Sequence, residues 1–350
     1  MNISEKALLL SGWIDEAQCI TCVCHARPDG DAAGSCTAMT GYLRKCRSKD
    51  AVSVYPDAAP DSLGFVTSLS PHITADTDLS RAKARIGSTD LLICLDFNTL
   101  SRAEGLEEDL RSAHCRKVLI DHHQSPVLSD FDLCFSNTDV SSACELLYSV
   151  LMLMPDVNAD ASRLPSESAE ALMTGMTTDT NNFANSVFPG TFRMASDLLA
   201  CGVDRNALID KLYFCERPNR LAAQGEMLST HMKILPCGAA VTVLHKDFYE
   251  RHALVDGETE GFVNLPLAVK DVRLSILVKE EESGKMRVSL RSKAGVSARR
   301  LAAECFHGGG HEQASGGKIL IPEDIKSPGE ADAYVADVAA RFMQDNYTED

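Results

Sequence analysis

Long apolar runs are absent from this sequence. Nothing in it approaches the roughly 18 consecutive apolar residues that a membrane-spanning helix needs, so we expect no such helix. The N-terminal stretch MNISEKALLLSGWIDEAQ also lacks the basic start, long apolar core and small-residue cleavage site of a signal peptide, and its apolar spacing predicts an amphipathic helix. We therefore expect a protein that neither spans a membrane nor is exported.

Positive charge and aromatic side chains are both scarce. Lysine and arginine number 34 against 50 aspartates and glutamates, which leaves a formal net charge of −16. Binding along double-stranded DNA needs a basic surface, so this balance argues against a long duplex as partner. Aromatic residues are only 6% of the chain, which leaves few platforms for stacked bases. Small anionic substrates remain compatible, because bound divalent cations can supply positive charge locally.

The cysteines do not form a disulfide pattern. There are 13, an odd number, scattered singly through apolar segments, which favours a reducing cytoplasm over secretion. Cys19, Cys22 and Cys24 are spaced closely enough to suggest zinc binding. They lie in a predicted buried strand, where only Cys22 and Cys24 would share a face, so core packing is favoured over a metal site.

Predicted strands and helices alternate in the first half of the chain. The length of 350 residues indicates two domains. The alternation predicts an α/β domain with a mostly parallel sheet and helices on both faces. Ligands of such sheets bind beyond the carboxyl ends of the strands. The predicted strands are 19–24, 51–55, 90–95 and 117–120, and the predicted helices are 31–46, 101–113, 140–153 and 166–176.

The second half follows a different pattern. Residues 192–232 have helical spacing and are expected to close the first domain and to connect it to the next. Beyond residue 236 the segments AAVTVLHKDF, VRLSILVKEE and KMRVSLRS predict strands, with EESGK (281–285) as a hairpin turn, followed by a helix, a glycine-rich loop, the strand KILI and a last helix. This pattern predicts a smaller α+β domain. We expect a first domain at 1–215, a helical linker at 216–235 and a second domain at 236–350.

Carboxylates and imidazoles follow four separate segments of the first domain. HARPDGD, CLDF and LIDHH each come directly after a predicted strand, and TTDT ends a predicted helix. Each could be ordinary by itself; Asp29 and Asp31, for example, could simply cap the next helix. In a parallel sheet, however, the groups that follow strands meet at one edge. The residues singled out are His25, Asp29, Asp31, Asp96, Asp121, His122, His123 and Asp179.

These residue types suit hard divalent metal ions. A mixed nitrogen and oxygen ligand set without thiolates favours Mn²⁺, with Mg²⁺ or other divalent ions as alternatives, and disfavours structural zinc. Six ligands are too many for one ion with an open position and about right for two ions that share a carboxylate. The expected ligands are His25, Asp29, Asp31, Asp96, His122 and Asp179.

A second candidate site lies near the C-terminus, in FHGGGHEQASGG (306–317). Consecutive glycines let backbone N–H groups approach an anion closely, although a flexible loop would look the same in sequence. Arg291 could contribute a guanidinium fork to a phosphate. We expect a pocket for a phosphate or a nucleotide end, formed by Arg291, Gly308, Gly309, Gly310, His311 and Ser315.

Taken in order, these motifs resemble a known family. HARPDGD, CLDF, LIDHH and TTDT are similar to the four motifs of the DHH phosphoesterases, and GGGH with ASGG resembles the DHH-associated C-terminal domain. The resemblance extends from about residue 15 to residue 345. Within the superfamily, the length and the C-terminal loop are similar to those of the NrnA-type enzymes, which are nanoRNases that often also act on 3′-phosphoadenosine 5′-phosphate.

The resemblance implies a role for each polar residue of the first domain. Asp96 would bridge two manganese ions. His123 would face the scissile phosphate, and Asp121 would orient the histidines. The C-terminal loop would bind the far end of the substrate across an interdomain cleft. The remaining ligands would divide between the ions, His25 and Asp29 to one and Asp31, His122 and Asp179 to the other.

The function implied is manganese-dependent hydrolysis of oligoribonucleotides of two to five residues, including pGpG and pApA, and of 3′-phosphoadenosine 5′-phosphate. A cyclic-dinucleotide phosphodiesterase, a RecJ-like single-strand exonuclease and a non-catalytic nucleotide-binding protein remain alternatives, and both a monomer and a homodimer stay open. One position departs from the pattern: NrnA-like sequences commonly have glycine after TDT, where this chain has Asn181. That residue puts the local backbone shape in question.

Overall fold

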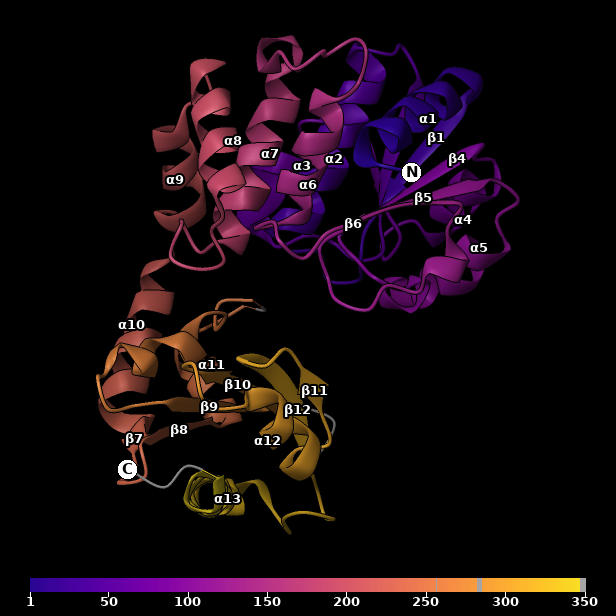
Figure 1. Ribbon diagram of the computed structural model, residues 1–350. Helices are drawn as coiled ribbons and strands as arrows, with labels where there is room; N and C mark the ends of the chain where they lie inside the picture. The colour runs from indigo at the N-terminus through magenta and orange to yellow at the C-terminus, as the bar shows by residue number, and fades with distance from the viewer. Residues whose placement is uncertain (256, 282–284, 347–350) are drawn as a thin grey trace. The chain divides into compact units, whose positions relative to one another are not determined.

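The chain forms two compact units, Met1–Cys215 and Glu216–Asp350 (Figure 1). The structure is a computed structural model that describes residues 1–255, 257–281 and 285–346. Among these residues, no helix combines the length and the apolar character required to cross a bilayer. All thirteen cysteines are free thiols, and Cys22 and Cys24 are buried in the core of the first unit.

A six-stranded parallel sheet forms the centre of the first unit. Its strand order is β3-β2-β1-β4-β5-β6, so the chain builds outward in both directions from the neighbours β1 and β4. The carboxyl ends of these two strands therefore flank the crevice in which such sheets bind ligands. The strands are β1 (Cys19–Val23), β2 (Asp50–Tyr55), β3 (His72–Thr74), β4 (Leu91–Leu95), β5 (Arg116–Asp121) and β6 (Leu133–Ser136).

Alternate residues of each strand enter opposite cores. Cys22 and Ile93 belong to the core on one face of the sheet, whereas Leu92 and Leu119 belong to the core on the other face. Figure 1 shows the two groups on either side of the sheet, which confirms the predicted α/β architecture. One group includes α1 (Ile3–Glu16), α2 (Gly30–Lys45), α3 (Gly64–Thr67), α6 (Ala143–Met152) and α7 (Ser166–Asp179), and the other includes α4 (Leu79–Gly87) and α5 (Glu107–Ser112).

Small residues let α2 and α7 pack against each other without space between their backbones. A Cβ atom on Gly34 would lie 2.6 Å from the carbonyl oxygen of Ala171. A Cβ atom on Gly175 would lie 2.3 Å from Sγ of Cys144 and 2.8 Å from Oδ1 of Asp31. Since real Cβ atoms do not approach this closely, glycine is required where the two helices and the first turn of α6 meet.

Several short elements of the first unit, among them β3, β6 and α4, were not predicted. β3 and β6 have three and four residues, too few for an alternating pattern to stand out, and α4 is short and strongly polar. The predicted helix at 101–113 forms as a 3₁₀ segment, Leu100–Leu106, followed by α5. Beyond α7, the unit is closed by α8 (Pro189–Ala200) and α9 (Arg205–Tyr213), as the helical spacing predicts.

The second unit contains a mixed six-stranded sheet. The order is β11-β12-β10-β9-β8-β7, in which β8 and β9 are parallel and the other pairs are antiparallel. The helices α12 and α13 pack on one face through a core that includes Val288 and Phe342. The strands are β7 (Lys233–Ile234), β8 (Ala239–Leu244), β9 (Leu274–Glu280), β10 (Lys285–Ser292), β11 (Gly309–Gly310) and β12 (Ala314–Leu320), and the helices are α10 (Pro218–Glu226), α11 (Lys246–Arg251), α12 (Ala298–Cys305) and α13 (Ala331–Asn346).

Two details of the second unit differ from expectation. The predicted linker at 216–235 is largely helical, but Ala223 and Met227 pack with Phe248, so this segment belongs to the second unit. The glycine-rich loop is shorter than predicted, because β12 begins at Ala314 and includes Gly316 and Gly317. β9 and β10 pair as an antiparallel hairpin, while residues 282–284 of the predicted EESGK turn lie outside the described residues.

Candidate active site

The sheet brings polar residues from four segments to the carboxyl ends of β1, β4 and β5. His25 follows β1, Asp96 follows β4, and His122 follows β5. Because β1 and β4 are neighbours, the first two residues stand on either side of the point where the strand order reverses. The helices add Asp31 from the first turn of α2 and Asp179 from the last residue of α7.

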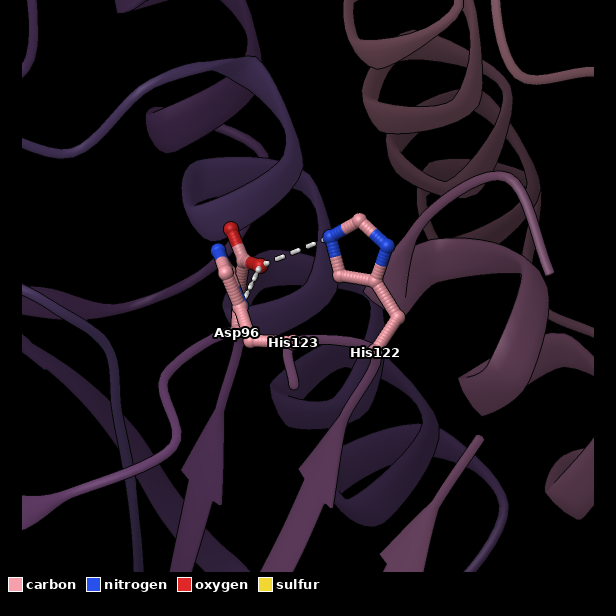
Figure 2. Close-up of side chains that lie close together, drawn as sticks. All are labelled: Asp96, His122 and His123. Atoms are coloured by element: carbon pink, nitrogen blue, oxygen red, sulfur yellow. Dashed lines mark ion pairs between the residues drawn. The ribbon is translucent and has the colours of Figure 1, made fainter. Parts of the chain in front are cut away.

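Asp96 is the central side chain. It is 2% exposed, and its Oδ2 lies 3.5 Å from Nε2 of His25 while its Oδ1 lies 3.5 Å from Nε2 of His122. Figure 2 marks ion pairs from this carboxylate to the rings of both His122 and His123. Its backbone is left-handed (φ 63°), which is uncommon for a residue other than glycine and aims the side chain into the cluster.

His122 joins the carboxylates of the two helices to Asp96. Its Nε2 lies 3.7 Å from Oδ2 of Asp179 and 3.9 Å from Oδ2 of Asp31. These separations exceed hydrogen-bonding distance and leave room between the ligand atoms. The imidazole therefore faces three carboxylates without bonding closely to any one of them.

The two aspartates of HARPDGD have different environments. Asp29 is the N-cap of α2, where its Oδ1 accepts hydrogen bonds from the backbone N–H groups of Asp31 and Ala32. Its Oδ1 also lies 3.9 Å from Nε2 of His25. The capping interpretation is therefore confirmed, and it is compatible with the predicted role as a metal ligand, since a carboxylate has lone pairs for both.

Asp31 is buried and accepts hydrogen bonds from a second helix. Its Oδ2 lies 2.6 Å from the backbone nitrogen of Ala143, and its Oδ1 lies 2.9 Å from that of Cys144. These N–H groups open α6, so the dipole of that helix also favours the negative charge. The sequence contains no signal for this contact, which joins residues far apart in the chain.

Asp121 holds His123 in place. Asp121 is fully buried at the end of β5, and its Oδ1 lies 2.7 Å from Nδ1 of His123 while its Oδ2 accepts from the backbone N–H of the same residue, at 3.2 Å. When the ring donates Nδ1–H to this carboxylate, its Nε2 is the atom directed away from Asp121. His123 also packs edge-on against His122, with ring centroids 4.8 Å apart.

The pKa values of the cluster are shifted in the direction expected for several carboxylates without a cation between them. Burial disfavours the charged forms of both His25 and His122, yet the neighbouring Asp96 outweighs it and raises each pKa to about 10. Burial, together with carboxylate repulsion, raises the pKa of Asp31 to about 7 and that of Asp179 to about 8. Burial would raise the pKa of Asp96 as well, but its contacts with the two histidines hold it below its usual value.

The donor set fits divalent metal ions. Among the described residues, ligand atoms within 4.8 Å of one another occur in three groups that contain Asp96 or His122. Oδ1 of Asp96 is buried and has no hydrogen-bond partner among the described residues, which is costly unless a cation satisfies it. The groups are His25, Asp29 and Asp96; Asp31, His122 and Asp179; and Asp96, His122 and His123.

The second unit has a pocket of about 520 Å³ on the outer face of β10 and β12. Arg291 lines it and is half-buried, with Nη1 donating to the carbonyl of Leu290, and burial lowers its pKa from the usual value. Of the other predicted residues, Gly309, Gly310, His311 and Ser315 line the pocket, and Gly308 is not among the lining residues. A Cβ on Gly308 would lie 2.0 Å from the carbonyl oxygen of Gly316, so that glycine allows a close backbone crossing.

Two polar side chains that line the pocket were missed in the sequence. Arg287 and Ser289 alternate with buried residues on β10 and share the face of Arg291. The period-two pattern of KMRVSLRS contains this information, because Met286, Val288 and Leu290 mark the opposite face. Lys318 on β12 pairs with Arg287 in register, so the strand face carries a row of cations.

Comparisons with known proteins agree with this geometry. Residues 19–176 match the DHH family, N-terminal domain, and residues 241–328 match the DHHA1 domain. The crystal structure of an exopolyphosphatase-related protein from Bacteroides fragilis is similar over 98% of each chain, with a TM-score of 0.90 and 31% identity. The bifunctional oligoribonuclease and PAP phosphatase NrnA of Thermus thermophilus is 28% identical over 298 residues, which cover 84% of this chain and 82% of that protein.

Proposed function

We propose that this chain, which belongs to the DHH family and is a hydrolase of phosphoester bonds, hydrolyses short oligoribonucleotides. We propose two divalent metal ions as its cofactors, with Mn²⁺ as the preferred ion. The substrates are two to five residues long and include linear dinucleotides such as pGpG and pApA. We propose removal of the 3′-phosphate of 3′-phosphoadenosine 5′-phosphate as a second activity. The observation that carries the proposal is the buried Asp96, whose two oxygens face different imidazoles.

Asp96 is proposed to be shared by both ions. Its Oδ2 faces the group of His25 and Asp29, and its Oδ1 faces His122. His122 in turn lies with Asp31 and Asp179 in the second group. Two divalent ions, when bound, lower the pKa of a bound water molecule and neutralise charge on the phosphoryl oxygens.

His123 is proposed to contact the reacting phosphate. Asp121 accepts Nδ1–H, which leaves Nε2 as the ring atom available to the phosphate, and it donates to a phosphoryl oxygen when it carries a proton. The carboxylate fixes the orientation of the ring, so Nε2 is already placed when negative charge develops on the phosphate. Asp121 acts only through His123 and is a positioning residue.

The pocket of the second unit is proposed to bind the end of the substrate. Its volume of about 520 Å³ suits one or two nucleotide units rather than a long strand. Arg291 and Arg287 provide guanidinium forks, which match phosphate geometry. Binding of a substrate end supports a preference for short chains. We further propose a cytoplasmic protein, since its thirteen thiols are free. Sedimentation velocity distinguishes a monomer from a homodimer.

A hydrolysis panel with Mn²⁺ tests the proposal. The panel contains pGpG, 5-mer and 30-mer RNA, 3′-phosphoadenosine 5′-phosphate, a cyclic dinucleotide and pyrophosphate. We expect rapid cleavage of pGpG and the 5-mer and slow cleavage of the 30-mer. Preference for the cyclic dinucleotide or for the 30-mer would favour a different phosphodiesterase. Manganese binding without hydrolysis of any substrate would identify a non-catalytic binding protein.

The variant His122→Ala tests the metal centre within that panel. We expect its activity to fall to background with an unchanged circular dichroism spectrum, because the ring lies at a strand end and contacts mainly carboxylates. His114→Ala is the matched control, since His114 is exposed outside the cluster. Wild-type activity in His122→Ala would refute the metal assignment.

A further inference from the structure

Two phenylalanine rings and a guanidinium form an aromatic platform on the first unit. The rings of Phe183 and Phe192 are stacked, with centroids 5.5 Å apart and planes 12° apart. The guanidinium of Arg205 lies 5.5 Å from the centroid of the Phe183 ring and also donates to the side-chain oxygen of Asn182. Phe192 is 57% exposed, so much of this large apolar side chain faces solvent.

The backbone that carries Phe183 is held in an unusual conformation. Asn181, Asn182 and Phe183 all have positive φ angles, of 46°, 56° and 67°. Asparagine tolerates this region, but phenylalanine rarely adopts it. The backbone N–H of Phe183 donates to Oγ1 of Thr180, and that of Asn182 donates to the carbonyl of Thr177. The loop is therefore fixed to the end of α7, and with it the ring of Phe183.

The platform is connected to the metal ligands along two separate paths. Along the chain, Asp179 ends α7 and the loop with Phe183 follows directly. Through space, α6 donates two N–H groups to Asp31 at its first turn, and Glu145 of the same turn accepts from Oγ1 of Thr191 at 2.6 Å. Thr191 precedes Phe192, so both ring-bearing segments are fixed to elements that hold metal ligands.

Glu145 makes the second path rigid. It is 3% exposed, and its Oε2 accepts hydrogen bonds from the backbone N–H and the hydroxyl of Ser141 as well as from Thr191. A Cβ on Gly190 would lie 2.3 Å from its Oε1, so the start of α8 packs directly on this carboxylate. The first turn of α8 cannot move without breaking buried hydrogen bonds.

We propose that the exposed face of Phe192, backed by Phe183 and Arg205, stacks a nucleobase of the substrate beside the scissile phosphate. The proposal rests on the function proposed above. An aromatic face accepts every base, because each base presents a π-face, and it contributes affinity without sequence selection. The cations Arg205 and the exposed Arg193 suit the phosphates on either side of the base.

Base-deleted substrates test the stacking directly. Phe192→Ala should raise the KM for pGpG about tenfold, as expected for loss of one stacked base, with little change in kcat. Two analogues of pGpG, each lacking one base, identify the contact: for one of them, wild type and Phe192→Ala should have the same KM. Phe192→Tyr retains a ring and should restore the wild-type KM for pGpG.

Leu199→Ala is the matched control, because Leu199 is an exposed apolar residue two turns further along α8. An unchanged KM for pGpG in Phe192→Ala would overturn the inference while leaving the proposed function intact. Equal effects of Phe192→Ala on pGpG and both analogues would also overturn it. A shift from dimer to monomer in Phe192→Ala would identify the platform as a contact between copies of this chain instead. Absence of hydrolysis in the wild type would contradict the proposed function itself.

Discussion

At the scale of single residues, the site depends on groups that hold other groups. Asp31 is anchored by two backbone N–H groups of α6, and His123 is anchored by both oxygens of Asp121. Such contacts fix the orientation of ligands and donors before substrate arrives, which is the condition for effective stabilisation of developing charge. Substitutions behind the cluster are therefore informative.

Asp121→Asn separates positioning from metal binding. The amide is a weaker acceptor than the carboxylate for Nδ1–H of His123 and holds the ring less firmly, so we expect kcat to fall about 10- to 100-fold. Manganese affinity, measured by calorimetry, should change little because Asp121 is outside the proposed ligand set. Asp132→Asn is the control, since Asp132 binds the backbone N–H of Lys117 at the opposite end of β5. Equal losses of kcat and of manganese affinity would show that His123 is itself a ligand.

At the scale of secondary-structure elements, close packing of α2, α6 and α7 determines where the carboxylates stand. Gly175 faces both Cys144 of α6 and Asp31 of α2. The absence of a side chain at this position allows Asp31 and Asp179 to approach the same atom, Nε2 of His122, at 3.9 and 3.7 Å. Helix packing and ligand geometry are therefore set by the same contact.

Gly175→Ala should disturb stability and metal binding together. The added methyl group would overlap Sγ of Cys144 and Oδ1 of Asp31, and overpacking of this kind costs about 1–3 kcal/mol. We expect a lower midpoint of thermal unfolding and weaker manganese binding. Gly175→Ala combined with Cys144→Ala should recover part of the stability, because it removes one of the two overlaps.

Gly12→Ala is the control for that experiment. Gly12 is an exposed helical residue, and a Cβ there would meet nothing within 4 Å. Alanine should raise stability slightly, by up to about 1 kcal/mol, through its better helix propensity. Normal manganese binding and normal stability in Gly175→Ala would show that the helices can separate without loss of the site.

At the scale of the whole molecule, the two units divide the chemistry. All the proposed metal ligands belong to the first unit, and the pocket with Arg291 belongs to the second. Metal affinity and affinity for the end of the substrate should therefore respond to different substitutions, since sites without shared partners act independently.

Arg291→Ala tests this division. We expect the KM for pGpG to rise about tenfold, as for loss of a charge-assisted hydrogen bond to phosphate, with unchanged manganese affinity. Arg299→Ala is the matched control, because Arg299 is exposed on α12 and does not line the pocket. Weaker manganese binding in Arg291→Ala would contradict independent roles of the two units.

The sequence by itself determined the fold class and the polar residues that meet at the sheet edge. Strands that alternate with helices predict a parallel sheet, and such a sheet collects His25, Asp96 and His122 at one edge whatever the order of its strands. The period-two pattern of β10 also places Arg287 on the same face as Arg291, so the sequence contained this lining residue although the predicted pocket did not include it.

Only the tertiary structure decided how these residues are arranged and supported. The placement of β1 beside β4, the hydrogen bonds from α6 to Asp31 and the stacking of Phe192 on Phe183 each join segments distant in the chain. Local periodicity carries no information on which distant surfaces pack together. The candidate metal ligands could therefore be named from sequence, whereas the groups that position them, and the aromatic platform, required the folded chain.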